Sequence, residues 1–151
     1  MEYPVAKCIT DSKDRMSATM ERLTTITSNL AEVEIYKANS DPEDFSPDFW
    51  EKTIKKYTDE IEYFQSRIRI IKIEQLIYNV VEKGNLTLLP TLRTRYVDQL
   101  GVVMDLSGNL VDQGRMPEGV FLKISEGSKK NYDVITQICD AFIKNIPLEK
   151  V

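Results

Sequence analysis

Charged residues are concentrated in one short apolar segment of the chain, Arg67-Ile-Arg-Ile-Ile-Lys-Ile-Glu74. A guanidinium group can bind a carboxylate through two parallel hydrogen bonds, and its aliphatic stem covers neighbouring apolar surface. The isoleucines between these charges indicate that the segment lies among packed helices. We therefore expect an ion-pair network between helices, formed by Arg67, Arg69, Lys72 and Glu74. The acceptor would be Glu74 or a carboxylate of a partner chain.

Direct contact between these cations and nucleic acid is the alternative interpretation. Acidic residues lie between the cations, and helical spacing distributes the cations around the axis instead of gathering them on one face. The chain as a whole carries a formal net charge of -4. An acidic protein repels a phosphate backbone, so we expect DNA contact to be weak or indirect.

Catalytic chemistry has little support in the residue types. The chain contains no histidine, which removes the usual general base and the commonest metal ligand. Cys8 and Cys139 lie near opposite ends of the chain and lack the spacing of a zinc site. Carboxylates between residues 41 and 48 are explained by capping and solvation of a helix start. We predict that the protein is not an enzyme and has no catalytic residue, metal site or cofactor.

The composition is that of a soluble globular protein. Of the 151 residues, 42% are hydrophobic and 29% are charged, which is enough apolar material for one ordinary domain. The first residues show no secretory signal, and no apolar run approaches the length that crosses a bilayer. We expect a cytoplasmic protein that has no membrane partner.

Residues 47–83 carry the strongest helical pattern. Ser46 suits the cap position, Pro47 suits the first helical position and Gly84 suits the end. Such a helix spans about 55 Å. Apolar residues recur at steps of three and four along a heptad seam, which consists of Trp50, Ile54, Tyr57, Ile61, Phe64, Ile68 and Ile71. The seam is either the core of an intramolecular bundle or an interface between chains.

Two further helices are predicted before residue 101. Asp11 and Ser12 can cap a first helix, whose apolar stripe is expected to be Met16, Met20, Leu23, Thr27 and Leu30. Residues 39–44 form a turn after it. Pro90 can open another helix that ends at Gly101. In the later half of the long helix, a second stripe between residues 70 and 81 indicates that neighbours cover both of its faces.

The pattern changes after residue 101. Residues 102–106 and 110–111 are typical of short extended segments, with a turn between them, and residues 120–124 predict a strand. A last helix is expected over residues 132–145. The predicted fold is therefore mainly α, a helical bundle domain with one very long helix (1–101), followed by a small C-terminal α/β appendage (102–151).

The segment from Arg67 to Glu74 resembles the helix signature Arg-x-Arg-Leu-x-Lys-Ile-Glu of subunits of the GINS family, a replication-fork assembly. The acidic turn Asp41-Pro-Glu-Asp-Phe45 and the segment Met116-Pro-Glu-Gly-Val-Phe-Leu-Lys-Ile124 are similar to further family features in the same order. The second segment resembles the strand that begins the small β-domain of family members. After Ile124 the chain departs from the family, in which more strands are expected.

The resemblance implies a non-catalytic scaffold subunit of a DNA replication complex. Its partners would be a paralogous GINS-type subunit, the MCM helicase and a RecJ-like protein, within a hetero-oligomer. The protein would be nucleoid-associated in an archaeon and nuclear in a eukaryote. Two alternatives remain open from the residues alone, a self-associating coiled-coil adaptor and a small nucleic-acid-binding regulator.

Overall fold

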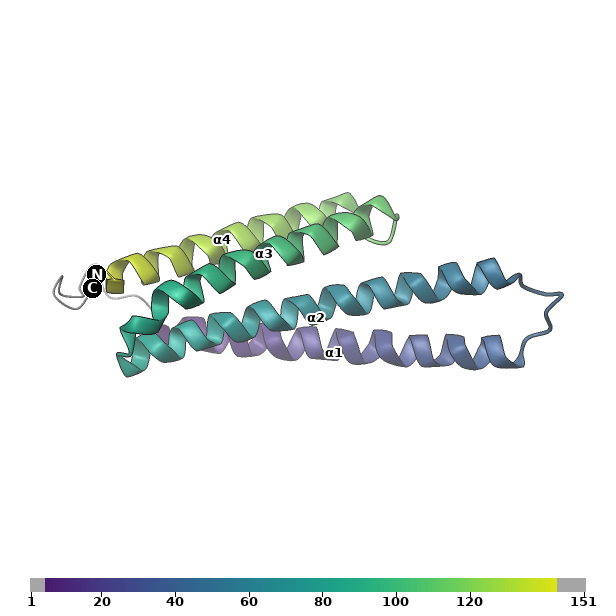
Figure 1. Ribbon diagram of the computed structural model, residues 1–151, viewed down its shortest axis with the longest axis horizontal. Helices are drawn as coiled ribbons and strands as arrows, with labels where there is room; N and C mark the ends of the chain where they lie inside the picture. The colour runs from purple at the N-terminus through teal and green to yellow at the C-terminus, as the bar shows by residue number, and fades with distance from the viewer. Residues whose placement is uncertain (1–4, 144–151) are drawn as a thin grey trace.

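The computed structural model describes residues 5–143, which form four long helices and one short 3-10 helix. Their bounds are α1 Val5–Asn39, α2 Pro47–Lys83, η1 Leu86–Leu88, α3 Leu89–Asp112 and α4 Glu118–Ile143. Helices α1 and α2 form a long antiparallel hairpin, and α3 and α4 form a shorter one beside it (Figure 1). The protein is mainly α-helical.

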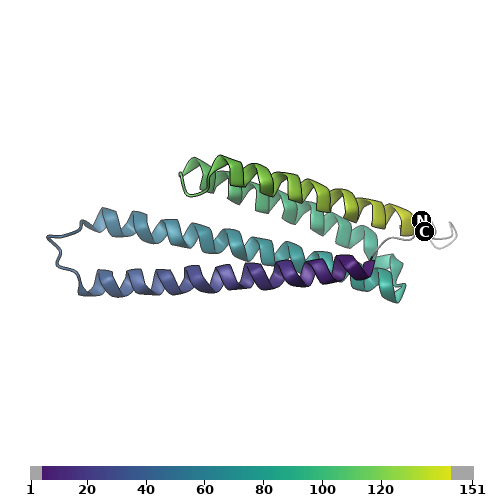
Figure 2. The same ribbon diagram turned by 180° about the vertical axis from the view of Figure 1, so that it is seen from behind.

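The two hairpins converge at one end and separate toward the other. Figures 1 and 2 show that they meet where α2 turns through η1 into α3, and that they diverge toward the α3–α4 turn. Both views also show the α1–α2 hairpin continuing past that turn. The distal part of α1 and α2 is therefore a two-helix arm, whereas the rest of the molecule has four helices in cross-section.

Helix α2 has the predicted boundaries. The Ser46 side chain accepts a hydrogen bond from the Phe49 amide at 3.1 Å, and Pro47 occupies the first turn. Gly84 adopts the left-handed conformation with φ 74°, which ends the helix without the steric penalty that a Cβ would bring. The amide of Asn85 then donates to the Val80 carbonyl at 3.1 Å. Local signals thus fix both ends of a helix of 37 residues.

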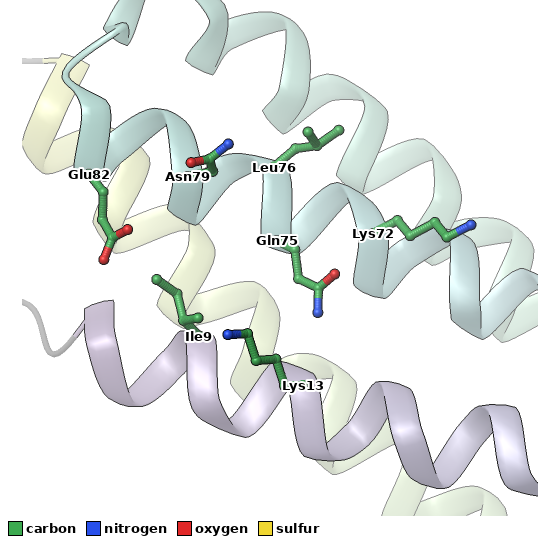
Figure 3. Close-up of a pocket in the computed structure, with 7 residues that line it drawn as sticks. All are labelled: Ile9, Lys13, Lys72, Gln75, Leu76, Asn79 and Glu82. Carbon is green, nitrogen blue, oxygen red and sulfur yellow. The ribbon is translucent and has the colours of Figure 1, made fainter.

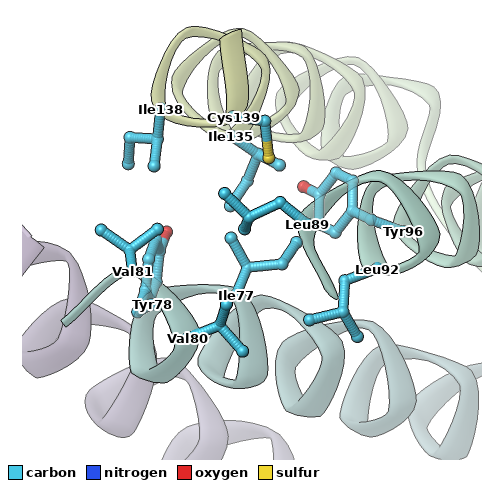
Figure 4. Close-up of a cluster of buried hydrophobic side chains, with 10 residues drawn as sticks. All are labelled: Ile77, Tyr78, Val80, Val81, Leu89, Leu92, Tyr96, Ile135, Ile138 and Cys139. Atoms are coloured by element: carbon cyan, nitrogen blue, oxygen red, sulfur yellow. The ribbon is translucent and has the colours of Figure 1, made fainter. Parts of the chain in front are cut away.

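The main core lies at the convergent end, where α2, α3 and α4 meet (Figure 4). Its buried side chains are Ile77, Tyr78, Val80, Val81, Leu89, Leu92, Tyr96, Ile135, Ile138 and Cys139. Partly buried residues near the start of α1, among them Val5 and Ile9, pack against this cluster. The later half of α2 is thus covered on both faces, by α1 and by the α3–α4 hairpin.

The face that α1 turns toward α2 differs from the predicted stripe. The buried positions are Ser12, Thr19 and Ile26, at seven-residue spacing, while Met20 is 47% exposed and Thr27 is exposed. The Ser12 and Thr19 hydroxyls each donate to a backbone carbonyl of α1, both at 2.7 Å. Because these bonds satisfy the hydroxyls internally, small polar residues can occupy a helix interface.

Helix α3 does not end at Gly101, and the extended segments predicted after it are wrong. The helix continues to Asp112, with Val103, Ser107 and Leu110 buried. These positions are spaced by four and three residues, so they extend the buried face that begins at Leu89. Packing of that face against α2 outweighs the roughly 1 kcal/mol that a glycine costs inside a helix. The predicted domain boundary at 101/102 therefore falls within a continuous helix.

The strand predicted over residues 120–124 is also wrong, because these residues form the first turns of α4. Pro117 precedes the helix, and its carbonyl accepts the amides of Val120 and Phe121 at 3.0 and 3.1 Å. No β-strand occurs between residues 5 and 143, so residues 102–143 consist of the end of α3, a turn and α4, and they do not form an α/β appendage. The expected last helix is part of α4, and its predicted end at residue 145 lies outside the described residues.

Candidate interaction surfaces

The most completely buried charged group is the carboxylate of Glu74 on α2, which is 1% exposed. Arg15 of α1 binds it through two hydrogen bonds, from Nη1 to Oε2 at 2.9 Å and from Nη2 to Oε1 at 2.6 Å. The Tyr78 hydroxyl, one turn further along α2, donates to Oε1 at 2.5 Å. Three donors thus compensate the buried charge, and the two from Arg15 tie α1 to α2 at this level.

The surroundings of Glu74 change the acidity of its neighbours. Burial raises the pKa of the Tyr78 hydroxyl well above its ordinary value, and the negative charge of Glu74 raises it further. Burial would lower the pKa of Arg15, but the hydrogen bond and charge of Glu74 outweigh it, so the pKa of Arg15 is raised. The raised pKa values favour a neutral Tyr78 hydroxyl that donates to Glu74 and a charged Arg15 guanidinium that pairs with it.

The other three members of the predicted network lie elsewhere. Arg67 is half-buried, and its guanidinium carbon lies 5.8 Å from the centre of the Tyr63 ring. Arg69 and Lys72 are exposed. None of the three forms an ion pair with another residue of the described range 5–143. The structure thus brings Glu74 together with Arg15 instead of with the cations near it in sequence.

Sequence reasoning missed Arg15 because the pair joins residues that are far apart in the chain. A signal was present, since Arg15 lies between Ser12 and Thr19 on the face that α1 turns toward α2. Recognising it requires the correct helical face of α1. The predicted stripe, which is based on methionine and leucine, placed Arg15 outside the interface.

The heptad seam of α2 turns mainly toward α1. Trp50 is 9% exposed and lines a hollow with Val33 and Tyr36 of α1. Phe64 lies under the Arg22 guanidinium of α1, at 5.9 Å from its ring centre. Ile68 and Ile71 are buried, and Ile54, Tyr57 and Ile61 are partly buried. Tyr57 points instead toward the α3–α4 turn, where its ring lies beside Arg115.

At the distal end of the arm, three aromatic rings gather around the α1–α2 turn. The ring centres of Phe45 and Phe49 are 4.7 Å apart and stacked, and each lies edge-on to Trp50, at 5.4 and 5.2 Å. Phe45 remains 45% exposed and Phe49 42% exposed. With Val33 and Tyr36, these rings border a hollow of about 500 Å³. We call these five residues the hairpin tip.

A second hollow of about 530 Å³ lies along the outer face of α1 and α2 (Figure 3). Gln75 points from α2 toward α1, where its amide donates to the Ser12 hydroxyl at 3.4 Å. Lys13 and Lys72 contribute cations, and the apolar lining consists of Ile9 and Leu76. This hollow is a shallow furrow between two antiparallel helices, and every charged side chain that lines it is solvent-exposed.

Comparisons with known proteins identified no relative of this chain. A scan of protein-family models, a search of curated proteins and a search of solved structures each found no match to the chain. Within residues 5–143, no group of three or more acidic or cysteine side chains is arranged to hold a metal ion. No helix in the same range is both long and apolar enough to cross a membrane.

Proposed function

We propose that this chain is a non-catalytic scaffold that assembles with a second helical protein through the hairpin tip. The supporting observation is the aromatic cluster of the tip, which is exposed beyond the reach of the α3–α4 hairpin. Covering Phe45 and Phe49, each a little under half exposed, contributes roughly 1 kcal/mol per ring. Contiguous exposed aromatic surface of this kind is typical of protein interfaces.

The length of the arm supports the same proposal. Contacts from the α3–α4 turn reach α2 at Tyr57, Asp59 and Glu60. Helix α2 begins ten residues before Tyr57, so the arm projects about 15 Å beyond its own bundle. A two-helix arm can complete a four-helix cross-section by receiving two helices of another molecule. The exposed rings would then enter a core.

Crosslinking of the complex isolated from its source cells tests the scaffold function. Lys37 and Lys52 flank the hairpin tip, and we expect their crosslinks to reach another protein. The double variant Phe45→Ser/Phe49→Ser should lose these crosslinks. Leu122→Ser removes a similarly exposed apolar side chain from α4 and should retain them, as a matched control.

Three results would count against the scaffold proposal. They are a chain that is monomeric in the cell, a tip variant that keeps all its crosslinks, and a control variant that loses them as well. Crosslinks between identical chains, with the mass of a homodimer in solution, would instead favour the self-associating adaptor. That alternative uses the same exposed rings but places a second copy of the arm on them.

Within this class, we propose a replication scaffold whose partners are a paralogous GINS-type subunit, the MCM helicase and a RecJ-like protein. Its support is the resemblance of the segment from Arg67 to Glu74. The strand that contributed to the resemblance is helical in this chain. Purified candidate partners should bind in a mass measurement, and binding to none of them would refute the replication proposal. Tight DNA binding that Arg67→Ala/Arg69→Ala abolishes would favour the nucleic-acid-binding regulator.

A further inference from the structure

A groove runs between the α1–α2 hairpin and the first half of α4, where the two hairpins diverge. Two adjoining hollows of about 280 and 330 Å³ share Arg67, Val120 and Ile124 in their lining. They therefore form one continuous channel along α4. We call it the α1–α4 groove and define it by Arg22, Phe64, Arg67, Val120, Lys123 and Ile124.

The groove concentrates positive charge on a protein that is acidic overall. Two glutamates line it, and both are already paired, Glu74 with Arg15 and Glu60 with Arg115. Arg22, Arg67 and Lys123 remain without an ion-pair partner among residues 5–143. Three uncompensated cations thus line one channel, while the chain carries a net charge of -4. Such a local field attracts an acidic ligand.

The same groove also has apolar walls. Val120 is 44% exposed, and Phe64 and Ile124 are partly buried. Tyr63, which lines the groove, is 1% exposed, and the guanidinium carbon of Arg67 lies 5.8 Å from the centre of its ring. The occupant should therefore combine negative charge with an apolar face.

We propose that the α1–α4 groove binds an acidic amphipathic helix of a partner protein. The channel follows α4 from Pro117 to Asn131, a length of about 21 Å, which matches a helix of about four turns. Leucine-like residues on one face of that helix contact Val120 and Ile124, and flanking carboxylates bind Arg67 and Lys123. A nucleic-acid strand satisfies the cations but leaves the apolar walls exposed.

Small residues on α4 allow the bound helix to approach closely. Gly127 and Ser128 line the groove in the stretch beyond Ile124. A Cβ added at Gly127 would meet no atom within 4 Å, so this position is open to a ligand. The surface is separate from the hairpin tip, and the proposal holds whether or not the tip binds a partner.

The test uses the full chain and three fluorescein-labelled helical peptides of about four turns. The first carries leucines on one face and glutamates on the flanks, the second replaces the glutamates with lysines, and the third is a scramble of the first. We expect the first to bind with an affinity on the order of micromolar in fluorescence anisotropy, and this affinity should fall as salt is raised. The other two should bind at least tenfold more weakly.

Matched charge variants locate the binding to the groove. Arg67→Gln/Lys123→Gln should weaken the acidic peptide about tenfold, as expected for two partly exposed charge pairs. Lys129→Gln/Lys130→Gln removes the same charge from exposed positions of α4 outside the groove and should change the affinity less than twofold. Circular dichroism and thermal unfolding must show that both variants are folded. Hydrogen exchange should slow in the first half of α4 when the peptide is bound.

Several outcomes would overturn the proposal. If the two double variants lose the same affinity, the effect comes from the net charge of the protein and not from the groove. If the lysine peptide or the scramble binds as tightly as the first peptide, the groove does not select an acidic amphipathic helix. Vesicles of phosphatidylcholine and phosphatidylserine that bind the groove and displace the peptide would identify a lipid surface as the occupant. A homodimer in which one copy fills the groove of the other would identify a second copy of this chain as the occupant.

Discussion

Replacing Arg15 should destabilise the protein more than replacing Glu74, although the two side chains form one ion pair. Their environments differ, because the Glu74 side chain is 2% exposed and the Arg15 side chain is 31% exposed. In Arg15→Met the carboxylate stays in the interior with only the Tyr78 hydroxyl as a partner. Breaking a buried pair in this way costs about 3 to 5 kcal/mol.

The reverse substitution leaves a charge that water can reach. In Glu74→Gln the Arg15 guanidinium can turn toward solvent, and the glutamine oxygen can still accept from Tyr78. We expect a cost of about 1 to 3 kcal/mol. The double variant Arg15→Met/Glu74→Met removes both charges and fills the space with apolar atoms, so it should be less destabilised than Arg15→Met alone and within about 1.5 kcal/mol of the parent.

Urea unfolding followed by circular dichroism measures the free energy of unfolding of the parent protein, the two single variants and the double variant. Arg15→Lys serves as the control, because it keeps the charge but loses the two-pronged hydrogen bond. A smaller loss for Arg15→Met than for Glu74→Gln would refute the reasoning from burial. A double variant that is as destabilised as Arg15→Met alone would show that the unpaired Glu74 carboxylate is not the cause of the loss.

Three further predictions follow from particular positions. Gly101→Ala should stabilise the protein by up to about 1 kcal/mol, since the added Cβ would stand in open space on α3. Gly84→Ala should destabilise the protein by about 1 kcal/mol, because φ at this position is 74°. Thermal unfolding of both variants measures the difference. Ile77→Ala empties a site that is 0% exposed and should cost about 3 to 4 kcal/mol in urea unfolding. Burial raises the pKa of the Cys8 and Cys139 thiols, so less thiolate is present at a given pH. Iodoacetamide should therefore label the folded protein more slowly than the unfolded chain between about pH 8 and 9. The difference should be largest at Cys139.

Helix α2 could be predicted from sequence because the information that specifies it is local. Ser46, Pro47 and Gly84 act within a turn of the helix ends, and the apolar spacing between them depends on the helix period alone. The covering of both faces of its later half was predicted for the same reason. Trp50 and Ile71 are buried on the predicted seam. The identity of the neighbour on each face required the structure.

The C-terminal half was mispredicted because short apolar runs fit a strand and a helix equally well. Residues 120–124 contain β-branched and aromatic side chains, which favour an extended segment when considered alone. In α4, Val120 and Ile124 are one turn apart and continue toward Ile135 and Ile138, which enter the main core. Burial of that distant face decides the local conformation. Five residues do not carry this information.

The charges of the segment from Arg67 to Glu74 show how one motif can serve different roles. Glu74 is sealed inside the bundle by an arginine 59 positions away, so its role depends on the pairing of α1 with α2. Arg67 lies in a groove on the opposite side of α2 from the furrow that Lys72 lines, and Arg69 faces solvent. A helix of this length presents different faces to different environments. The carboxylate therefore contributes to the stability of the bundle, and the cation of Arg67 remains available for an acidic partner.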